Sequence, residues 1–428
     1  MGSIFVEVTI AIIPYIMKIL HTSDWHLGQT LHFQSRDEEH SLFLDWLYTI
    51  IVKENIECLI HSGDVFDVGN PSNSSRELYF TFLSKLQSTH CTTTIIIAGN
   101  HDSPMMLQHS ASLLANLQIF VITTAQNLQE PIEIKNSLGE VKAICYPIPY
   151  LRDQDLMLYK QDEDIDETKK RLRNAIESYY IQAFTTTQQN NIQNVPIILT
   201  GHLVAHKGEL TESQSERPIH RQNFGELHTA NLPSGISYVA LGHLHKPQQI
   251  NGGVLTRYAG SPIPLSFQEV SYKHSVTIVE INGNTLQTEQ IPIPRFRLLL
   301  RISICNFLEF EQSLQKQVDM STTLSPTWIE CECVDFLATD SLKIDLQTIA
   351  QNYNAVIVKF VYTITDTKIQ SSTSIHQKDI GSFTDEEMFL LALEQNGNSL
   401  NEEDQKDVFE TFLEALEQFQ EKNMEGKQ

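Results

Sequence analysis

Five short apolar runs between residues 17 and 245 each end in aspartate or histidine, and this pattern most limits what the chain can fold into. The runs read MKILHTSD, ECLIHSGD, TTTIIIAGNHD, VPIILTGH and ISYVALGHLH. Amphipathic stretches lie between them, and this alternation predicts an α/β fold with the runs as strands. In such a sheet the loops at the carboxyl ends of the strands converge on one crevice. The polar groups that end the five runs are therefore expected to meet there.

The residues at these strand ends are of types that bind metal ions. They are Asp24, His26, Asp64, Asn100, His101, Asp102, His202, His243 and His245. A glycine directly precedes four of the five clusters, and glycine permits a tight turn and a close approach of the backbone. Carboxylates, an amide oxygen and imidazoles together suit divalent ions of intermediate hardness, Mn²⁺ above all, with Fe²⁺, Zn²⁺ and Co²⁺ as alternatives.

Two such ions would allow phosphoester hydrolysis without a serine or cysteine nucleophile. A pair of ions about 3.5–4 Å apart needs a bridging carboxylate, and Asp64 is the best candidate. The pair would bind a phosphate oxygen, generate a nucleophile from water and offset charge during an in-line displacement.

Other residues near these motifs have simpler interpretations. A single histidine at a strand end is more often structural than a ligand, but five clusters within residues 24–245 favour a functional centre over coincidence. We expect His61 and His206 to be neighbours of the site rather than ligands, and His21 to be a core or surface residue. Trp25 is expected to be a packing residue, with the lining of a substrate cleft as the alternative.

The composition sets limits on binding partners. The chain has 428 residues, with 30 Lys plus Arg against 53 Asp plus Glu, which gives a formal net charge of −23. Such a protein cannot bind DNA through a general basic coating, so nucleic-acid contacts must come from local basic residues, metal ions or a partner subunit. The hydrophobic fraction of 41% is ample for sizeable cores and excludes a disordered or fibrous class.

The cysteines and residues 1–16 indicate in which cellular compartment the protein is expected. The six cysteines contain no Cys-x-x-Cys pair, which argues against a disulfide scaffold and a zinc ribbon and fits a reducing compartment. Residues 1–16 are apolar, but Glu7 and Pro14 interrupt them and no basic leader precedes them, unlike a secretory signal. We therefore expect a cytoplasmic protein. A further hypothesis is that translation can start at Met17, with residues 1–16 dispensable.

Local patterns predict several helices. Ser35 with Glu38 forms a capping box before an amphipathic helix, and a second helix is expected over residues 74–87. The charged stretch 162–174 leads into a third helix, and the polar run TTTQQNN that follows is expected to be a loop.

The same patterns divide the chain into parts. Residues 17–290 form the predicted catalytic domain, closed by a β-hairpin across an Asn-Gly-Asn turn. Residues 297–365 alternate as strand, helix, strand, helix and strand, and predict a small separate α/β unit. A polar linker over 366–380 and capped helices over 381–428 are expected to follow.

The order of the five clusters resembles that of the calcineurin-like metallophosphoesterases. Longer strings are similar to the nuclease subunits of bacterial SbcC–SbcD complexes, namely HTSDWHLGQ, SGDVFDVGNPS, ICYPIPYLR, YVALGHLHKPQ and YAGSPIPLSF. The likeness is strong over residues 17–290 and weaker beyond them. It implies a sandwich of two sheets flanked by helices, followed by a small α/β capping domain and C-terminal helices.

The resemblance also implies a role for each candidate residue. One ion would be held by Asp24, His26, Asp64 and His245, and the other by Asp64, Asn100, His202 and His243. His101 would contact the scissile phosphate and help to stabilise or protonate the leaving oxygen, with Asp102 orienting its ring.

This chain departs from related families at two positions. Archaeal and eukaryotic relatives carry a histidine three places after the bridging aspartate, where this chain has Asp67, so a substrate contact by that histidine is in question here. The protein phosphatase branch carries arginine directly after the second aspartate of Gly-Asp-x-x-Asp. Val68 at that position argues against that branch.

The implied activity is that of an ATP-dependent double-strand 3′–5′ exonuclease with single-strand and hairpin endonuclease activity, acting in DNA end processing, repair and recombination. Its partner would be a coiled-coil ATPase of the SbcC type, with two copies of each chain in a heterotetramer. Residues 297–365 would cap the DNA, and the helix near 74–87 would be a dimer element. The apolar stripe of the final helices, Phe409, Phe412, Leu416 and Phe419, would dock on the partner or fold onto the chain itself.

Two other interpretations stay open. One is a different enzyme of the superfamily that acts on nucleotides or phosphoproteins. The length of chain after residue 290 disfavours it, because a small-substrate hydrolase needs neither a capping unit nor docking helices. The other is a non-catalytic adaptor with the same fold, and the intact ligand set argues against it.

Overall fold

A computed structural model of the chain describes residues 15–125, 130–152, 155–156, 165–206, 226–317, 322–334 and 340–363. The chain divides into two compact units. The first comprises residues 1–298 with 322–324, and the second comprises residues 299–321 with 325–428. The predicted N-terminal extension up to residue 14, the linker after residue 365 and the final helices lie outside the described residues.

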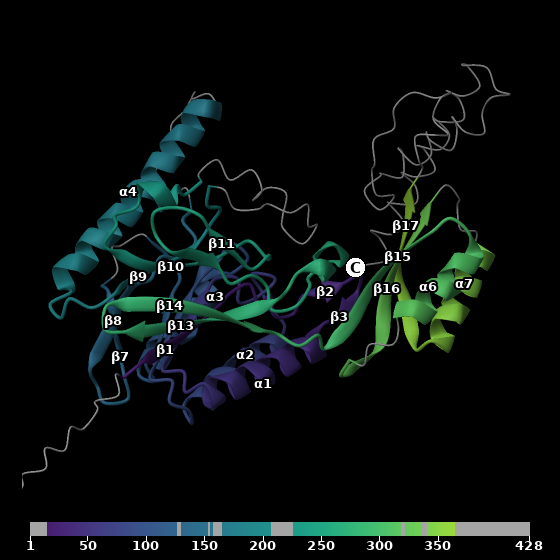
Figure 1. Ribbon diagram of the computed structural model, residues 1–428, viewed down its shortest axis with the longest axis horizontal. Helices are drawn as coiled ribbons and strands as arrows, with labels where there is room; N and C mark the ends of the chain where they lie inside the picture. The colour runs from purple at the N-terminus through teal and green to yellow at the C-terminus, as the bar shows by residue number, and fades with distance from the viewer. Residues whose placement is uncertain are drawn as a thin grey trace, which may run out of the picture. The chain divides into compact units, whose positions relative to one another are not determined.

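The first unit contains two six-stranded sheets (Figure 1). The first sheet has the order β14-β13-β1-β4-β5-β6. Its strands are β1 (Met17–Thr22), β4 (Cys58–Ser62), β5 (Thr93–Ile97), β6 (Ile119–Ile122), β13 (Ser275–Asn282) and β14 (Thr285–Pro292). Strands β1, β4, β5 and β6 are parallel, and β13 and β14 form the antiparallel hairpin that the sequence predicts.

The second sheet has the order β11-β12-β10-β9-β8-β7. Its strands are β7 (Ile132–Lys135), β8 (Val141–Tyr146), β9 (Ile197–His202), β10 (Ile236–Gly242), β11 (Gln248–Ile250) and β12 (Thr256–Tyr258). Strands β8, β9, β10 and β12 are parallel, with antiparallel strands at both edges. All five apolar runs identified in the sequence are therefore parallel strands, three in one sheet and two in the other.

The two sheets pack face to face over a dry core. Ile19, Ile60 and Ile95 of the first sheet are fully buried in one cluster with Ile198 and Tyr238 of the second. Each sheet also packs helices on its outer face, so the central strands are covered on both sides. Strands buried on both faces read as continuous apolar runs rather than alternating ones.

Helices cover both outer faces of this sandwich. Helices α1 (Asp37–Lys53), α2 (Asn73–Leu86) and α3 (Pro104–Ala115) share a buried cluster with the first sheet. Helix α4 (Ile165–Asn190) packs on the second sheet through residues that include Tyr180 and Ala183. Figure 1 shows α4 on one side of the sheets and α1 with α2 on the other. The predicted two-sheet sandwich flanked by helices is confirmed.

The start of helix α1 differs from the prediction. The sequence predicts a cap by Ser35 together with Glu38, but the capping position belongs to Arg36, and its side chain makes no capping hydrogen bond. Arg36 is fully buried, with Nε 2.5 Å from Oε2 of Glu39 and Nη1 donating to the carbonyl oxygen of Pro264. Glu39 lies within the helix itself, whereas the contact with Pro264 comes from a distant segment that local sequence does not reveal.

The predicted loop TTTQQNN is wrong, because helix α4 continues through it to Asn190. The hydroxyl of Thr187 donates to the carbonyl oxygen of Ala183 at 2.7 Å, and that of Thr185 donates to Ile181 at 2.8 Å. Hydroxyls that bond one turn back along a helix are satisfied within it. Thr187 is also fully buried, so packing on the second sheet holds a polar stretch in the helical state.

The second unit has a three-stranded sheet in the order β15-β16-β17. Its elements are β15 (Arg297–Ile304), α6 (Phe307–Gln317), β16 (Leu324–Val334), α7 (Asp340–Asn352) and β17 (Ala355–Thr363). They follow the predicted alternation of strand and helix. Phe310, Leu314, Leu346 and Ala350 are fully buried. Among the residues that the structure describes, no helix has both the length and the apolar character needed to cross a membrane.

Replacing Glu39 by alanine should destabilise the protein strongly. The change removes the carboxylate that faces the buried Arg36 guanidinium. Removing one partner of a buried ion pair typically costs about 3–5 kcal/mol in the free energy of unfolding. Urea denaturation of the full chain would measure it. Asp45→Ala is the matched control, because its pair with Lys85 is exposed and should contribute less than about 1 kcal/mol. Equal losses in the two variants would contradict this assignment.

Candidate metal centre

The structure brings the seven predicted metal ligands together at the carboxyl ends of five parallel strands. They come from the loop after β1 (Asp24, His26), the loops after β4 (Asp64) and β5 (Asn100), the end of β9 (His202) and the loop after β10 (His243, His245). These strands belong to both sheets, so the site lies where the two sheets meet at one end of the sandwich. For brevity, the set Asp24, His26, Asp64 and His245 is called the first position, and the set Asp64, Asn100, His202 and His243 the second position.

The second position is tightly clustered. Nε2 of His202 lies 3.1 Å from Oδ2 of Asp64 and 2.9 Å from Oδ1 of Asn100. Nδ1 of His243 lies 3.0 Å from the same asparagine oxygen. Donor atoms of Asp24, Asp64 and His202 also lie within 4.8 Å of one another, so the two positions adjoin at Asp64.

The first position contains a nitrogen with the properties of a metal ligand. Donor atoms of Asp24, His26 and His245 lie within 4.8 Å of one another. Nε2 of His26 is buried 3.6 Å from Oδ2 of Asp64, and among the described residues it has no hydrogen-bond partner. A buried polar atom of this kind is costly unless something coordinates it. The residues present therefore fit a divalent metal ion.

The electrostatics of the cluster favour a cation. Burial alone would lower the pKa of His202, but the Asp64 carboxylate outweighs burial and raises that pKa to about 9. Burial alone would raise the pKa of Asp64, yet the surrounding histidines, with His202 foremost, hold it well below its usual range. These shifts show a strong attraction between the Asp64 carboxylate and the His202 imidazole, and a divalent ion bound beside them would replace the proton that His202 holds.

The backbone at the site is held in an uncommon conformation. Asp24, His26, Asp64 and His243 have φ values of 52°, 47°, 57° and 99°. For residues with a side chain, the left-handed region costs about 1–2 kcal/mol each. Strain of this kind concentrates at functional sites, where the surrounding structure enforces it.

Two glycines allow the ligands to approach. A Cβ on Gly63 would lie 2.3 Å from Nδ1 of His202, and one on Gly99 would lie 2.1 Å from Oδ1 of Asp64. Real Cβ atoms do not come so close to other atoms, so only glycine fits at either place. This explains why glycine precedes the ligands in these motifs.

His101 lies at the edge of the cluster, but Asp102 does not orient its ring as predicted. Nδ1 of His101 donates to the backbone oxygen of Asp67 at 2.8 Å. The carboxylate of Asp102 instead accepts three backbone N–H groups, those of Val65, Phe66 and Gly99. Asp102 therefore ties the loop after β4 to the loop after β5. The backbone N–H of His101 also donates to Oδ1 of Asp64, at 2.8 Å.

Two carboxylates that the sequence does not single out as site residues contact the predicted ligands. Oδ1 of Asp67 lies 3.2 Å from Nδ1 of His26, and Oε1 of Glu269 lies 3.0 Å from Nδ1 of His245. The only signal for Glu269 is an acidic residue shortly after the apolar, proline-rich segment SPIPLSF. Asp67 stands out only as a departure from the related sequences.

The other three histidines that the sequence singles out, and Trp25, lie outside the cluster. His21 is buried, with Nδ1 2.9 Å from the hydroxyl of Tyr238. His61 is buried with its ring 4.4 Å from that of Trp25, and burial lowers its pKa to about 3. Trp25 is fully buried, which makes it a packing residue and not part of a cleft. His206 pairs with Glu226 near the surface.

Comparison with known proteins agrees with this geometry. Residues 17–247 match the family model for calcineurin-like phosphoesterases. The SbcD subunit of nuclease SbcCD from Escherichia coli (strain K12) is 32% identical over 409 residues, which are 94% of this chain and 98% of that protein. The chain belongs to the SbcD family. The family resemblance inferred from the motifs is thereby confirmed.

Other SbcD proteins align over a shorter range. The SbcD protein of Bacillus subtilis is 37% identical over 269 residues, covering 62% of this chain and 66% of that protein. The SbcD protein of Rhodobacter capsulatus is 32% identical over 295 residues, covering 67% of this chain and 71% of that protein. Among solved structures, a dimetal phosphatase from Danio rerio aligns with 65% of this chain and 99% of its own, at 12% identity and a TM-score of 0.36, too low to add to the assignment.

Replacing Asp64 by alanine should abolish binding at both positions, because its carboxylate lies beside ligands of each. Metal analysis of Mn²⁺-loaded protein after desalting would measure the number of ions per chain. The expected result is two ions for the wild type and none for the variant, with Asp45→Ala unchanged. An Asp64→Ala protein that keeps both ions would refute the bridging assignment.

Proposed function

We propose that this SbcD-family protein is the nuclease subunit of a DNA-processing complex and hydrolyses phosphodiesters at a centre of two divalent ions, with Mn²⁺ the best match. The observation that carries the proposal is the meeting of the seven candidate ligands around Asp64. The likeness to the Escherichia coli SbcD nuclease over 98% of that protein's length supports DNA as the substrate. The finer activity is that implied by the resemblance: ATP-dependent 3′–5′ exonuclease on double strands and endonuclease on single strands and hairpins.

Divalent ions at this centre would polarise the phosphate and supply a nucleophile from water at neutral pH. The protein's own residues determine how they are held. Nδ1 of His202 faces the carbonyl oxygen of Ser62 at 2.8 Å, and a carbonyl oxygen can only accept, so Nδ1 carries a proton. Its Nε2 is thereby directed to the cluster beside Asp64. The glycines at 63 and 99 keep the two loops close enough for Asp64 to serve both positions.

His101 is placed to assist the leaving group. Its Nδ1 donates to the carbonyl oxygen of Asp67, which fixes the ring and leaves Nε2 as the nitrogen that can transfer a proton. Its donor atom lies within 4.8 Å of those of His26 and Asp64, so the ring adjoins the first position without belonging to either set of candidate ligands. We assign His101 to stabilising or protonating the leaving oxygen.

The partner would be a coiled-coil ATPase of the SbcC type, in a heterotetramer with two copies of each chain. A net charge of −23 makes it difficult for this chain alone to attract DNA, so the ATPase would supply most phosphate contacts. The small unit over residues 297–365 would cap the DNA. The final helices over 381–428 would dock on the ATPase.

His101→Ala should separate metal binding from catalysis. The assay would use Mn²⁺-loaded protein with the suspected ATPase and ATP, hairpin DNA and a chromogenic phosphodiester. The wild type should cleave the hairpin, with ATP increasing the rate. His101→Ala should keep two ions per chain and lose about 10²–10⁴-fold in cleavage rate, as is typical when a general acid is removed.

Two results would contradict the proposal. Cleavage by His101→Ala at the wild-type rate would remove its assigned role. Hydrolysis of the small ester alone by the wild type, even with the ATPase present, would favour the rival enzyme that acts on nucleotides or phosphoproteins.

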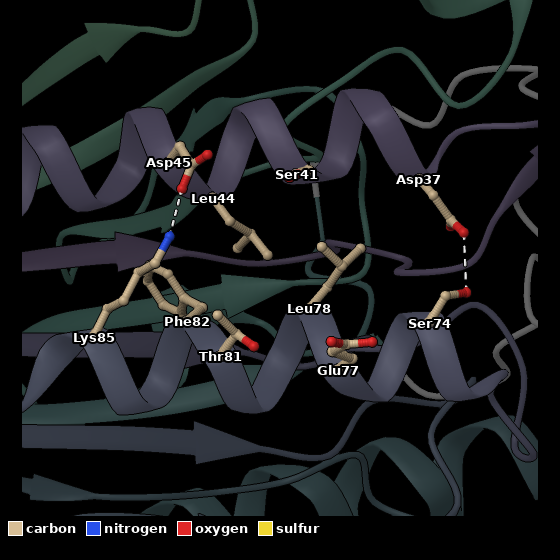
Figure 2. A pocket seen from close by; sticks show the side chains of 10 residues that line it. All are labelled: Asp37, Ser41, Leu44, Asp45, Ser74, Glu77, Leu78, Thr81, Phe82 and Lys85. Atoms are coloured by element: carbon tan, nitrogen blue, oxygen red, sulfur yellow. Dashed lines mark hydrogen bonds and ion pairs between the residues drawn. The ribbon is translucent and has the colours of Figure 1, made fainter.

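Helices α1 and α2 form the surface that we propose for contact with a second copy of the chain. A groove of about 310 Å³ runs between them. Figure 2 shows Leu44 and Leu78 toward its middle and Phe82 beside the Asp45–Lys85 pair at one end; Leu44 and Phe82 are themselves largely buried. An apolar strip with a charged rim is typical of protein interfaces. We propose that the helix pair forms the homodimer contact.

Thr81→Arg should disrupt this dimer. Thr81 is exposed and lines the groove, so the arginine adds bulk and charge there without disturbing the core. Light scattering after size exclusion should give a dimer for the wild type and a monomer for the variant. Ser112→Arg, on the exposed side of α3, should stay dimeric. A dimeric Thr81→Arg protein would place the contact elsewhere.

A further inference from the structure

The two metal positions have different surroundings. In the first position both histidines face a carboxylate through the nitrogen that points away from the cluster: His26 faces Asp67 at 3.2 Å and His245 faces Glu269 at 3.0 Å. A carboxylate oxygen only accepts hydrogen bonds, so each Nδ1 must donate and each Nε2 must face the centre. Both rings are thereby fixed in the form that binds a metal.

For His202, one of the two histidines of the second position, the corresponding contact is neutral. Nδ1 of His202 faces the backbone carbonyl of Ser62 at 2.8 Å. Both positions share the carboxylate of Asp64. The other oxygen donor is the amide of Asn100 in the second position and the carboxylate of Asp24 in the first position. The first position therefore has one more carboxylate among its candidate ligands, and a carboxylate lies behind each of its two histidines.

The local fold holds Asp67 firmly against His26. The loops after β1 and β4 are joined by a β-bridge between Leu27 and Phe66, and the backbone N–H of Asp67 donates to the carbonyl oxygen of Leu27. This pairing places the two side chains next to one another.

Glu269 is held equally firmly. It lies in a short 3₁₀ helix over Phe267–Ser271 and is fully buried. One carboxylate oxygen faces Nδ1 of His245, and the other accepts the backbone N–H of Leu265 at 2.9 Å. A buried carboxylate fixed at both oxygens orients the His245 ring with little freedom.

We propose that the first position binds a divalent ion more tightly than the second and fills before it, and that Asp67 and Glu269 are positioning residues that create this difference. A carboxylate behind a ligating histidine fixes the tautomer and raises the basicity of the ligating nitrogen, and its loss typically lowers metal affinity about 10–100-fold. Nε2 of His26, buried and without a hydrogen-bond partner among the described residues, is the atom on which Asp67 acts. The inference rests on the metal centre of the proposed function.

Asp67 is the more suitable residue to change. Its side chain is 30% exposed, and the contact to His101 uses its backbone oxygen, which a substitution leaves in place. An effect of the side chain on the first position can therefore be separated from an effect on His101. Asp67→Asn keeps an oxygen that can accept from His26 but removes the charge, whereas Asp67→Ala removes both.

The test is calorimetric titration of the full-length, metal-free protein with Mn²⁺ alone. The wild type should show two classes of site at least tenfold apart in affinity. Asp67→Ala should weaken the tighter class about 10–100-fold and change the weaker class less than twofold. Asp67→Asn should fall between the wild type and Asp67→Ala, and Glu269→Gln should weaken the same class. Glu133→Ala, at an exposed carboxylate paired with Lys135, should match the wild type.

The outcomes separate this inference from the proposed function. Two sites of equal affinity in the wild type, or an unchanged tighter class in folded Asp67→Ala, would overturn the inference while leaving a dimetal centre in place. If Glu269→Gln fails to fold, the Asp67 variants decide the matter alone. Absence of Mn²⁺ binding in the wild type would overturn both the inference and the proposed function.

Discussion

The Asp64 carboxylate is the interaction on which the rest of the site depends. One oxygen accepts the backbone N–H of His101 from the loop after β5, and the other lies 3.1 Å from His202 at the end of β9 and 3.6 Å from His26 after β1. This one side chain thus links loops from both sheets. The cluster also concentrates carboxylate, amide and imidazole donors in a buried space, and cations at its centre would offset the mutual repulsion of its carboxylates.

The fold tolerates local strain to bring these groups together. Four of the seven candidate ligands have a left-handed backbone, and a side chain at position 63 or 99 would collide with His202 or Asp64. The free energy cost of this backbone strain is offset by apolar burial in the sandwich, whose central strands are buried on both faces. A rigid body of two sheets is therefore what permits a strained, highly charged site at its end.

Much of this arrangement was predictable from the sequence. Strands buried on both faces produce continuous apolar runs, and the carboxyl ends of parallel strands converge, so the meeting of these polar groups follows from residue types and their places in the chain. Which seven of them are the candidate ligands follows from the family resemblance. The hairpin β13–β14 and the alternation of the second unit follow from equally local signals.

What the sequence did not predict depends on contacts between distant segments. The buried Arg36 at the start of α1 donates to the carbonyl oxygen of Pro264, and the polar end of α4 packs on a sheet. Likewise the partner of His101 is a backbone oxygen, which has no sequence signature, and Glu269 lies 24 residues after the histidine that it contacts. Residues that act only by positioning another side chain are the hardest to identify from residue types alone.

The most direct test of the central claim is anomalous diffraction from crystals of the protein grown with Mn²⁺. The account predicts two peaks about 3.5–4 Å apart, one on each side of Asp64, with Nε2 of His26 facing one and Nε2 of His202 facing the other. Peaks bound elsewhere on the chain, with the seven side chains uncoordinated, would contradict it.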